Sequence, residues 1–256
     1  TSELVRLIEE KRKSGVFLSI LGFGMGNYKD GRMEQLADNG NGNYAYIDNF
    51  DEAKKVFVQE MGGTLHTIAK DVKLQIEFNP AHVKEYRLVG YENRKLKNED
   101  FNNDKKDAGD LGAGHTVTAI YEIIPTGTET TSAGKVDPLK YQDRSVKRWA
   151  KVDPDWMTIK LRYKKPNENI SKLLEVTTKD NGLSLQATSN NFRFSAAVAS
   201  FAMTLRDSKF KGNANYDNIS ELAQGALGKD EHGYRKEFLD LIQKAKQADI
   251  RMTAEK

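Results

Sequence analysis

The sequence predicts an α/β plus α+β chain in three sections, and three changes of apolar pattern carry that prediction. Residues 1–69 alternate helical and strand patterns, which is typical of one half of a doubly wound, Rossmann-like domain. Residues 70–125 switch to alternation with period two, which predicts an antiparallel, β-sandwich-like unit. Residues 126–256 combine strand patterns with apolar residues at helical spacing, which predicts a C-terminal strand-plus-helix module.

The composition permits a folded core and excludes several kinds of chemistry. Of the 256 residues, 38% are hydrophobic, which is enough for a core. The absence of cysteine excludes disulfides, a thiol nucleophile and a thiolate metal site. No apolar run approaches the roughly 20 residues that cross a membrane. The net charge of +3 divides into −3 over residues 1–125 and +6 over residues 126–256, which favours a boundary near Pro125.

Five elements are expected in the first section. They are a helix from Ser2, a strand at 16–24, a helix at 32–38, a strand at 43–48 and a helix from Phe50 to Met61. The continuous apolar run at 16–24 predicts a strand buried on both faces. Asn49 and Glu52 form a capping box that opens the last helix. Because two parallel strands leave their own edges unsatisfied, we expect further strands before Thr1, and self-association through the open edge without them.

Three closely spaced glycines follow the first predicted strand. Gly22, Gly24 and Gly26 read GFGMG. A dinucleotide-binding loop needs GxGxxG followed directly by a helix, and this segment meets neither condition. We interpret it as a strand end and a tight turn, where glycine takes positive φ angles.

The run GVFLSILGFGMGNYKDGRMEQLADNGNGNYAYIDNFDEAKKVFVQEMGG and its continuation to Pro80 resembles the C-terminal half of a bacterial von Willebrand factor A domain. The likeness is to envelope-associated, often lipid-anchored proteins in which that domain precedes a C-terminal domain of unknown function. It continues through AGHTVTAIYEIIP and covers most of the chain. The resemblance implies a cell-envelope location, tethering through an upstream lipid anchor, and a protein-interaction or adhesion role with an unknown protein partner.

The resemblance transfers no metal ligand. The divalent-cation adhesion site of that family is built from a DxSxS loop, a Thr and an Asp, all upstream of the segment that matches here. DxSxS does not occur in these 256 residues. No cofactor, metal or catalytic residue is therefore assigned.

In the second section, strands are expected at 72–78, 86–91 and 116–124. The predicted inward set of the first is Val72, Leu74, Ile76 and Phe78, and the outward set is Lys73, Gln75 and Glu77. The loop at 98–110 is rich in acids. Aligned with an EF-hand loop, Asp100, Asn102 and Asp104 take the first three ligand positions. Lys105 then stands where glycine is required, and Leu111 where the glutamate ligand is required, so the pattern fails. A nonstandard calcium site of Asp104, Asp107 and Asp110 is the alternative to a solvated loop.

The third section opens with an exposed linker at 126–138. A strand pair is expected at 157–164 and 172–178, the first with a basic outer face, followed by helices at 194–205, 217–227 and 234–248. Residues 135–165 carry ten Lys or Arg. The aromatic residues interleaved with them are Tyr141, Trp149, Trp156 and Tyr163. Such a pattern suits single-stranded nucleic acid or another polyanion, but we interpret Trp149 and Trp156 as core or interdomain anchors.

No catalytic motif is present. The four histidines, at 66, 82, 115 and 232, form no HExxH pair, and neither a GxSxG elbow nor a Walker loop occurs. The sequence therefore predicts a non-catalytic protein-interaction module. The alternatives are an enzyme, perhaps a hydrolase, with a site assembled in space, and polyanion binding through 135–165.

Overall fold

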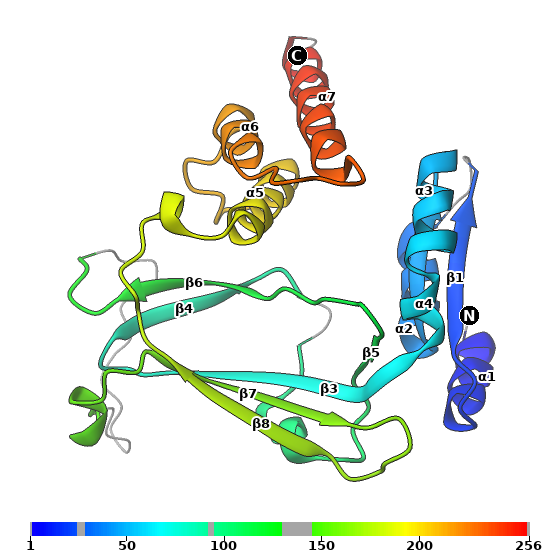
Figure 1. Cartoon of the computed structure of the whole chain (residues 1–256), viewed down its shortest axis with the longest axis horizontal. Helices are drawn as coiled ribbons and strands as arrows, with labels where there is room; N and C mark the ends of the chain where they lie inside the picture. The colour runs from blue at the N-terminus through cyan, green and yellow to red at the C-terminus, as the bar shows by residue number, and fades with distance from the viewer. Residues whose placement is uncertain (1, 25–28, 92–94, 130–144, 255–256) are drawn as a thin grey trace. The chain divides into compact units, whose positions relative to one another are not determined.

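The computed structural model describes residues 2–24, 29–91, 95–129 and 145–254 (Figure 1). The chain forms two compact units of interleaved segments, which are described separately. Unit 1 consists of Thr1–Glu77, Leu96–Val117 and Met157–Thr177; unit 2 consists of Phe78–Lys95, Thr118–Trp156 and Thr178–Lys256. The predicted α/β plus α+β class is confirmed. The division at 69/70 and 125/126 stays a prediction about domains, while unit 1 alone draws on all three sections.

The first part of unit 1 alternates helix and strand. Its elements are α1 (Ser2–Lys13), β1 (Leu18–Phe23), α2 (Asp30–Asn39), β2 (Asn41–Ile47), α3 (Phe50–Lys54), a π-helical turn (Lys55–Gln59) and α4 (Met61–Leu65). The two strands pair in parallel, from Leu18 opposite Asn41 to Phe23 opposite Ile47. This is the predicted parallel pair flanked by helices.

Two predictions about this part were wrong. The helix from Phe50 is interrupted, although Asn49 caps it as predicted by accepting a hydrogen bond from the Glu52 N–H at 2.9 Å. The β-branched Val56 and Val58 favour helix less than straight-chain residues do, and a π-helical turn replaces the α-helix there. The strand β1 was predicted to be buried on both faces, but it is not, since Phe23 is 60% exposed. Within the described residues β1 has only β2 as a neighbour.

The second part of unit 1 is a four-stranded sheet in the order β5-β3-β7-β8. Its strands are β3 (Thr67–Phe78), β5 (Gly109–Gly112), β7 (Met157–Lys164) and β8 (Lys172–Thr178). The predicted neighbours β7 and β8 are confirmed as hydrogen-bonded strands. β3 pairs antiparallel with β5, with a register shift between Ala69 and Val72.

The register shift overturns the predicted facing of β3 beside Asp71. Asp71 lies at φ 50°, in the left-handed region, so the strand bulges there. Side-chain direction alternates with period two, so one extra residue exchanges the two faces. Beside the bulge this exchange is observed: Lys73, predicted to face solvent, is 2% exposed, and Leu74, predicted to face the core, is 47% exposed. At the end of the strand the predicted facing is confirmed, since Phe78 is 8% exposed and the Glu77 side chain is 73% exposed.

Unit 2 combines a two-stranded ribbon with a helical cluster. β4 (Val83–Val89) and β6 (Ile120–Pro125) pair antiparallel. The helices are α5 (Asn190–Leu205), α6 (Tyr216–Gln224) and α7 (Tyr234–Ala254), at the predicted places. Their shared core consists of Ala197, Phe201, Ile219, Ala223 and Ile242. In the described part of the chain, no helix is both long and apolar enough to cross a bilayer.

Candidate functional site

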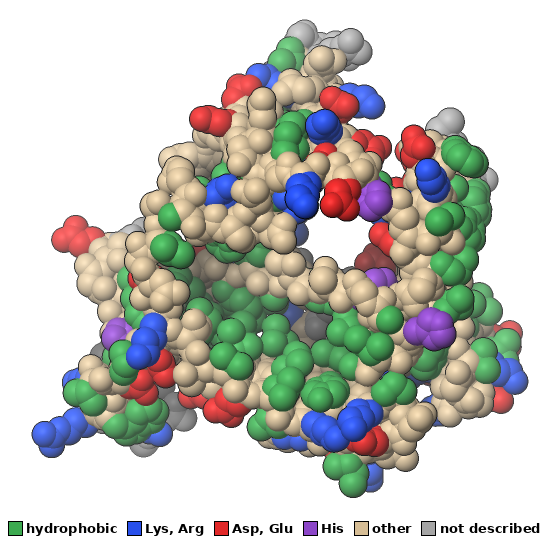
Figure 2. Space-filling view, viewed as in Figure 1, with side chains coloured by type: hydrophobic (Ala, Val, Ile, Leu, Met, Phe, Trp, Pro, Cys, Tyr) green, Lys and Arg blue, Asp and Glu red, His purple; other side chains and the backbone are tan. Residues whose placement is uncertain are grey.

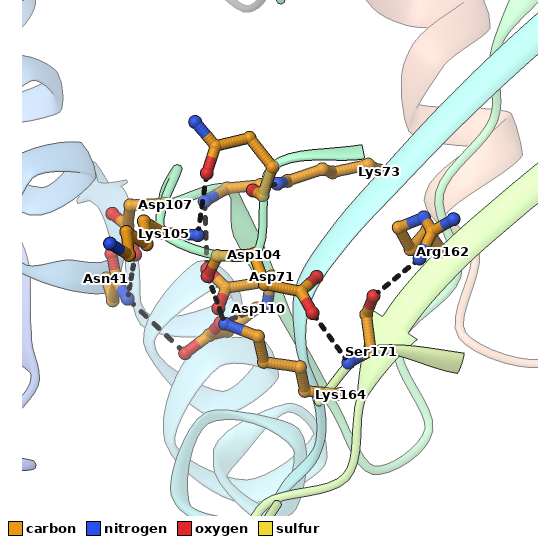
Figure 3. Close-up of polar contacts among 12 residues, drawn as sticks. Asn41, Asp71, Lys73, Asp104, Lys105, Asp107, Asp110, Arg162, Lys164 and Ser171 are labelled. Carbon is orange, nitrogen blue, oxygen red and sulfur yellow. Dashed lines mark hydrogen bonds and ion pairs between the residues drawn. The ribbon is translucent and has the colours of Figure 1, made fainter. Parts of the chain in front are cut away.

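Unit 1 holds a cluster of charged side chains, which we call the charged cluster (Figure 3). Its members are Asp71, Lys73, Asp104, Asp107, Asp110 and Lys164. They come from β3, from the acidic loop at 98–110 and from β7. The bulge at Asp71 turns its carboxylate toward the acidic loop, so strands and loop meet in one polar network.

Lys164 joins three segments of unit 1. Its Nζ donates to the Asp71 Oδ2 at 2.6 Å and to the Asp104 carbonyl at 2.7 Å. The other Asp71 oxygen accepts from the Ala108 N–H at 3.0 Å. The Lys164 and Asp71 side chains are 11% and 16% exposed. Lys164 was predicted to lie on a basic outer face of the strand at 157–164. That prediction was wrong, because its ammonium group is buried and bonds to Asp71 and Asp104.

Lys73 is the more deeply buried lysine. Its Nζ donates to the Asn103 carbonyl at 2.6 Å and to the Asp100 carbonyl at 3.1 Å. Burial lowers the pKa of Lys73, and the Asp71 carboxylate opposes that shift. The ammonium thus holds the turn at 100–103 onto β3.

The three acids of the alternative calcium site are already engaged. The Asp104 Oδ2 accepts from the Ser171 N–H at 3.3 Å, and bonding to Ser171 lowers the pKa of Asp104. Asp107 forms an ion pair with the Arg12 guanidinium at 2.8 Å. The Asp110 Oδ1 accepts from the Asp71 N–H at 3.1 Å.

This donor set does not fit a cation. A protein cation or a backbone N–H group bonds to one oxygen of each of the three acids, and desolvation raises the pKa of both Asp107 and Asp110. Among the described residues, no group of three or more His, Asp or Glu side chains is placed to hold a metal ion. The arrangement is a structural joint. Two buried atoms in it, the Asp104 Oδ1 and the Arg162 Nε, have no hydrogen-bond partner in the described structure.

The glycines and aromatic residues singled out above lie as follows. Gly22 is within β1, Gly24 takes φ 80° as a tight turn requires, and Gly26 is outside the described residues. Trp149 is 61% exposed, so its assignment to the core was wrong. Trp156 is half-buried and stacks on His82, with ring centroids 5.6 Å apart.

The aromatics of the basic segment form no platform in the described structure. Tyr163 is half-buried in β7 and belongs to unit 1, whereas Trp149 and Trp156 belong to unit 2. Tyr141 lies outside the described residues. Base stacking along a strand needs several exposed rings in succession. Among the described aromatic residues of this segment, Trp149 is the one with an exposed ring.

Strand β8 exposes apolar side chains that the sequence analysis did not single out. Leu173, Leu174 and Val176 are 45%, 53% and 62% exposed, and among the described strands β8 is the last of its sheet. We call these three residues and the backbone between them the β8 edge. The signal in the sequence was the LLEV run, in which apolar residues do not alternate and so cannot all face one side.

Unit 2 has a cavity of about 660 Å³ beside the first turns of α5 and α7. Its lining includes Asn191, Asp230, His232 and Arg235. The Arg235 guanidinium donates to the Ala226 carbonyl at 2.7 Å and to the Asn191 side chain at 2.5 Å. Desolvation acts against ionisation of Asp230, but hydrogen bonds from the Arg235 and Lys236 N–H groups outweigh it and lower its pKa. These groups serve to cap and anchor α7, and the geometry assigns them no reaction.

Comparison with known proteins places the chain in a family. Residues 63–248 match the family model described as "Uncharacterized protein YfbK, C-terminal". The chain is 43% identical over 239 residues to "Uncharacterized protein YfbK" of Escherichia coli (strain K12). That match covers 93% of the chain but only 40% of the relative.

A solved structure, "von Willebrand factor type A from Catenulispora acidiphila", matches 92% of the chain and 53% of its own length. The identity is 12% and the TM-score is 0.34, values at which no conclusion about fold or function is drawn. The assignment rests on the sequence matches, which span well over half of the chain. The chain belongs to the YfbK C-terminal family.

Proposed function

We propose that this chain is a non-catalytic protein-interaction module, and that the β8 edge receives an extended segment of a protein partner. One observation carries the proposal: an outermost strand exposes three large aliphatic side chains. An edge strand presents N–H and C=O groups that have no strand on one side, and these are a template for a further strand.

The β8 edge offers both affinity and selectivity to such a segment. Backbone hydrogen bonds to an added strand provide a sequence-independent contribution. Burying apolar surface contributes roughly 25 cal/mol per Å², so the aliphatic surface that such a segment covers favours association before the entropy of binding is subtracted. Lys172 and Glu175, both exposed, discriminate between partner segments by charge.

Photocrosslinking tests this proposal directly. A photoreactive amino acid at Leu174 or at Val176 should capture a discrete protein in cells that express the natural full-length protein. Leu183, which is 60% exposed and lies outside the sheet, is the matched control. Crosslinks to the same polypeptide would assign the β8 edge to an internal contact and contradict the proposal, as would equal capture at position 183.

A substitution pair adds a second test of the β8 edge. Leu174→Lys and Val176→Lys place charges at exposed positions, so they should leave folding intact and abolish capture of the partner by an unchanged crosslinking site. Leu183→Lys should leave capture unchanged. Hydrolytic turnover by the purified protein, without a stable partner, would favour the enzymatic alternative instead.

The proposed setting is the bacterial cell envelope, with tethering through an upstream lipid anchor. Support comes from the resemblance to envelope-associated von Willebrand factor A proteins. Fractionation of cells that make the full-length protein tests it. Recovery in the membrane fraction, released by detergent and not by salt, is the expected result, and recovery in the cytoplasmic fraction would contradict it.

A further inference from the structure

A turn in unit 2 presents apolar and cationic side chains together. Trp149, the first residue of a short 3-10 helix at Trp149–Lys151, is 61% exposed, and Val152, which follows that helix, is 81% exposed. Lys147, Arg148 and Lys151 flank them and are also exposed. We call residues 147–152 the basic turn, which contains the short green helix at lower left in Figure 1. Figure 2 shows hydrophobic, basic and acidic side chains on that projection.

The backbone beneath the basic turn is firmly held. Ala150 is 5% exposed, and the Asn79 side-chain amide donates to its carbonyl at 2.9 Å and to the Asp155 carbonyl at 3.0 Å. The His82 Nε2 lies 2.7 Å from the Asp153 carbonyl. The exposed Trp149 ring therefore stands on a backbone that hydrogen bonds hold in place. These hydrogen bonds fix the turn in a conformation that leaves the Trp149 ring in solvent.

The acidic side chain that follows the basic turn directly in the sequence is held in its own loop. The nearby Asp153 carboxylate accepts a hydrogen bond from the Asp155 N–H at 2.9 Å, which turns it back into its own loop. Among the described residues, no acidic side chain pairs with Lys147, Arg148 or Lys151. The Lys147 ammonium lies 5.9 Å from the centre of the Trp149 ring, so charge and ring are side by side.

This chemistry fits an anionic lipid surface better than a nucleic acid. Indole rings favour the membrane–water interface, and basic residues near an anionic surface each strengthen binding about fivefold. Val152, the more exposed of the two apolar residues, has no π-face on which a base could stack. We propose that the basic turn binds anionic phospholipid bilayers, with Trp149 and Val152 entering the headgroup region and the three cations on lipid phosphates. This inference is independent of the β8 edge.

Tryptophan fluorescence on vesicles tests the proposal. The chain has two tryptophans, so Trp156→Phe leaves Trp149 as the reporter and keeps an aromatic ring against His82. Vesicles of phosphatidylglycerol and phosphatidylcholine should shift its emission to the blue, and phosphatidylcholine vesicles should not. The difference between the natural protein and Trp149→Phe gives the same information without altering position 156.

Variants separate insertion from charge. Trp149→Ala should weaken vesicle binding about tenfold, and each of Lys147→Gln, Arg148→Gln and Lys151→Gln about fivefold. Leu183→Ala and Lys179→Gln, exposed positions elsewhere in unit 2, should change nothing. Thermal unfolding confirms that each variant is folded.

Several results would overturn the proposal. One is salt-sensitive binding to vesicles without a blue shift, which would be charge attraction alone. Another is binding to single-stranded DNA that is tighter than binding to vesicles and quenches Trp149, which would assign the turn to nucleic acid. The third is vesicle binding that the turn variants leave intact.

Discussion

At the scale of single residues, two lysine ammonium groups inside unit 1 carry a cost that their neighbours offset. Taking an ammonium out of water is unfavourable unless carboxylates or carbonyls replace the lost hydration. Lys164 obtains a carboxylate and a carbonyl, and Lys73 obtains two carbonyls. The same contacts fix the acidic loop, so that loop is an organised part of the sheet.

Replacing Lys73 by Met should destabilise unit 1 by about 1–3 kcal/mol, because the Asp100 and Asn103 carbonyls lose their donor. Urea unfolding measures the change, and hydrogen exchange should show faster opening of residues 96–110. The control is Lys97→Met, at a lysine whose side chain is 79% exposed, where a change within 0.5 kcal/mol is expected. A Lys73→Met variant as stable as the natural protein would show that the ammonium contributes nothing net.

Asp110 makes the stability of unit 1 depend on pH. Desolvation raises the pKa of Asp110, partly opposed by the Asp71 N–H hydrogen bond, so the folded state keeps this proton to higher pH than the unfolded state does. The folded state is then favoured at low pH. That advantage is lost as pH rises from the ordinary aspartate pKa, about 3.9, through the raised folded pKa.

Asp110→Asn should remove this contribution while keeping an oxygen acceptor for the Asp71 N–H. The free energy of unfolding of the variant relative to the natural protein should therefore increase across that pH window and level off above it. Urea unfolding from pH 4 to pH 8 measures the difference. A difference that does not change with pH would contradict the raised pKa.

At the scale of elements, a bulge interrupts the regular pairing of β3 with β5. Asp71 adopts φ 50° there and bonds to Lys164 and Ala108. Aspartate tolerates the left-handed region better than most residues, and a Cβ atom costs roughly 1–2 kcal/mol in it. Position 71 therefore requires both a residue that tolerates positive φ and a carboxylate that accepts hydrogen bonds.

A pair of substitutions at Asp71 separates the effect of positive φ from the effect of the carboxylate. Asp71→Gly and Asp71→Ala both lose the carboxylate, but glycine takes positive φ freely, so the Gly variant should be more stable than the Ala variant by about 1 kcal/mol. At Leu74, in regular strand, the order should reverse, with Ala above Gly by roughly 0.5–1 kcal/mol. Urea unfolding of the four variants checks both orders. The same order at both positions would argue against a bulge at Asp71.

At the scale of the whole molecule, the compact units are assembled from segments distant in the chain, and unit 1 exposes apolar surface beside its first strand. Leu4, Leu7 and Phe23 are 48%, 49% and 60% exposed. β1 pairs with β2 alone among the described strands. Such an edge favours pairing with another chain.

We therefore expect residues 1–256 to self-associate as their concentration rises, and Phe23→Lys to reduce this. The control is Phe50→Lys, at a phenylalanine that is 81% exposed and lies in a helix. Sedimentation velocity measures association, and hydrogen exchange measures protection of β1. A monomer whose β1 is strongly protected would contradict the prediction.

The local elements could be predicted from the sequence because their causes are local. Apolar spacing located α5, α6 and α7, and Asn49 caps α3 as the capping box indicated. The acidic loop was recognised, and its mismatch to an EF-hand was visible in the residue order. Its role as a joint was not visible, because Lys73 and Lys164 reach it from separate strands.

The sequence by itself determined the class of fold, the absence of cysteine chemistry and the places of most helices and strands, since periodicity and composition depend on neighbouring residues. It did not indicate α4 or the short strand β5, which begins in the predicted acidic loop. Only the tertiary structure decided that Lys73 lies inside and Leu74 outside, because the bulge beside them forms where β3 pairs with the distant strand β5. It likewise decided that Trp149 faces solvent and that β8 is an edge. Strand neighbours and exposure depend on contacts between distant segments, and no local pattern encodes them.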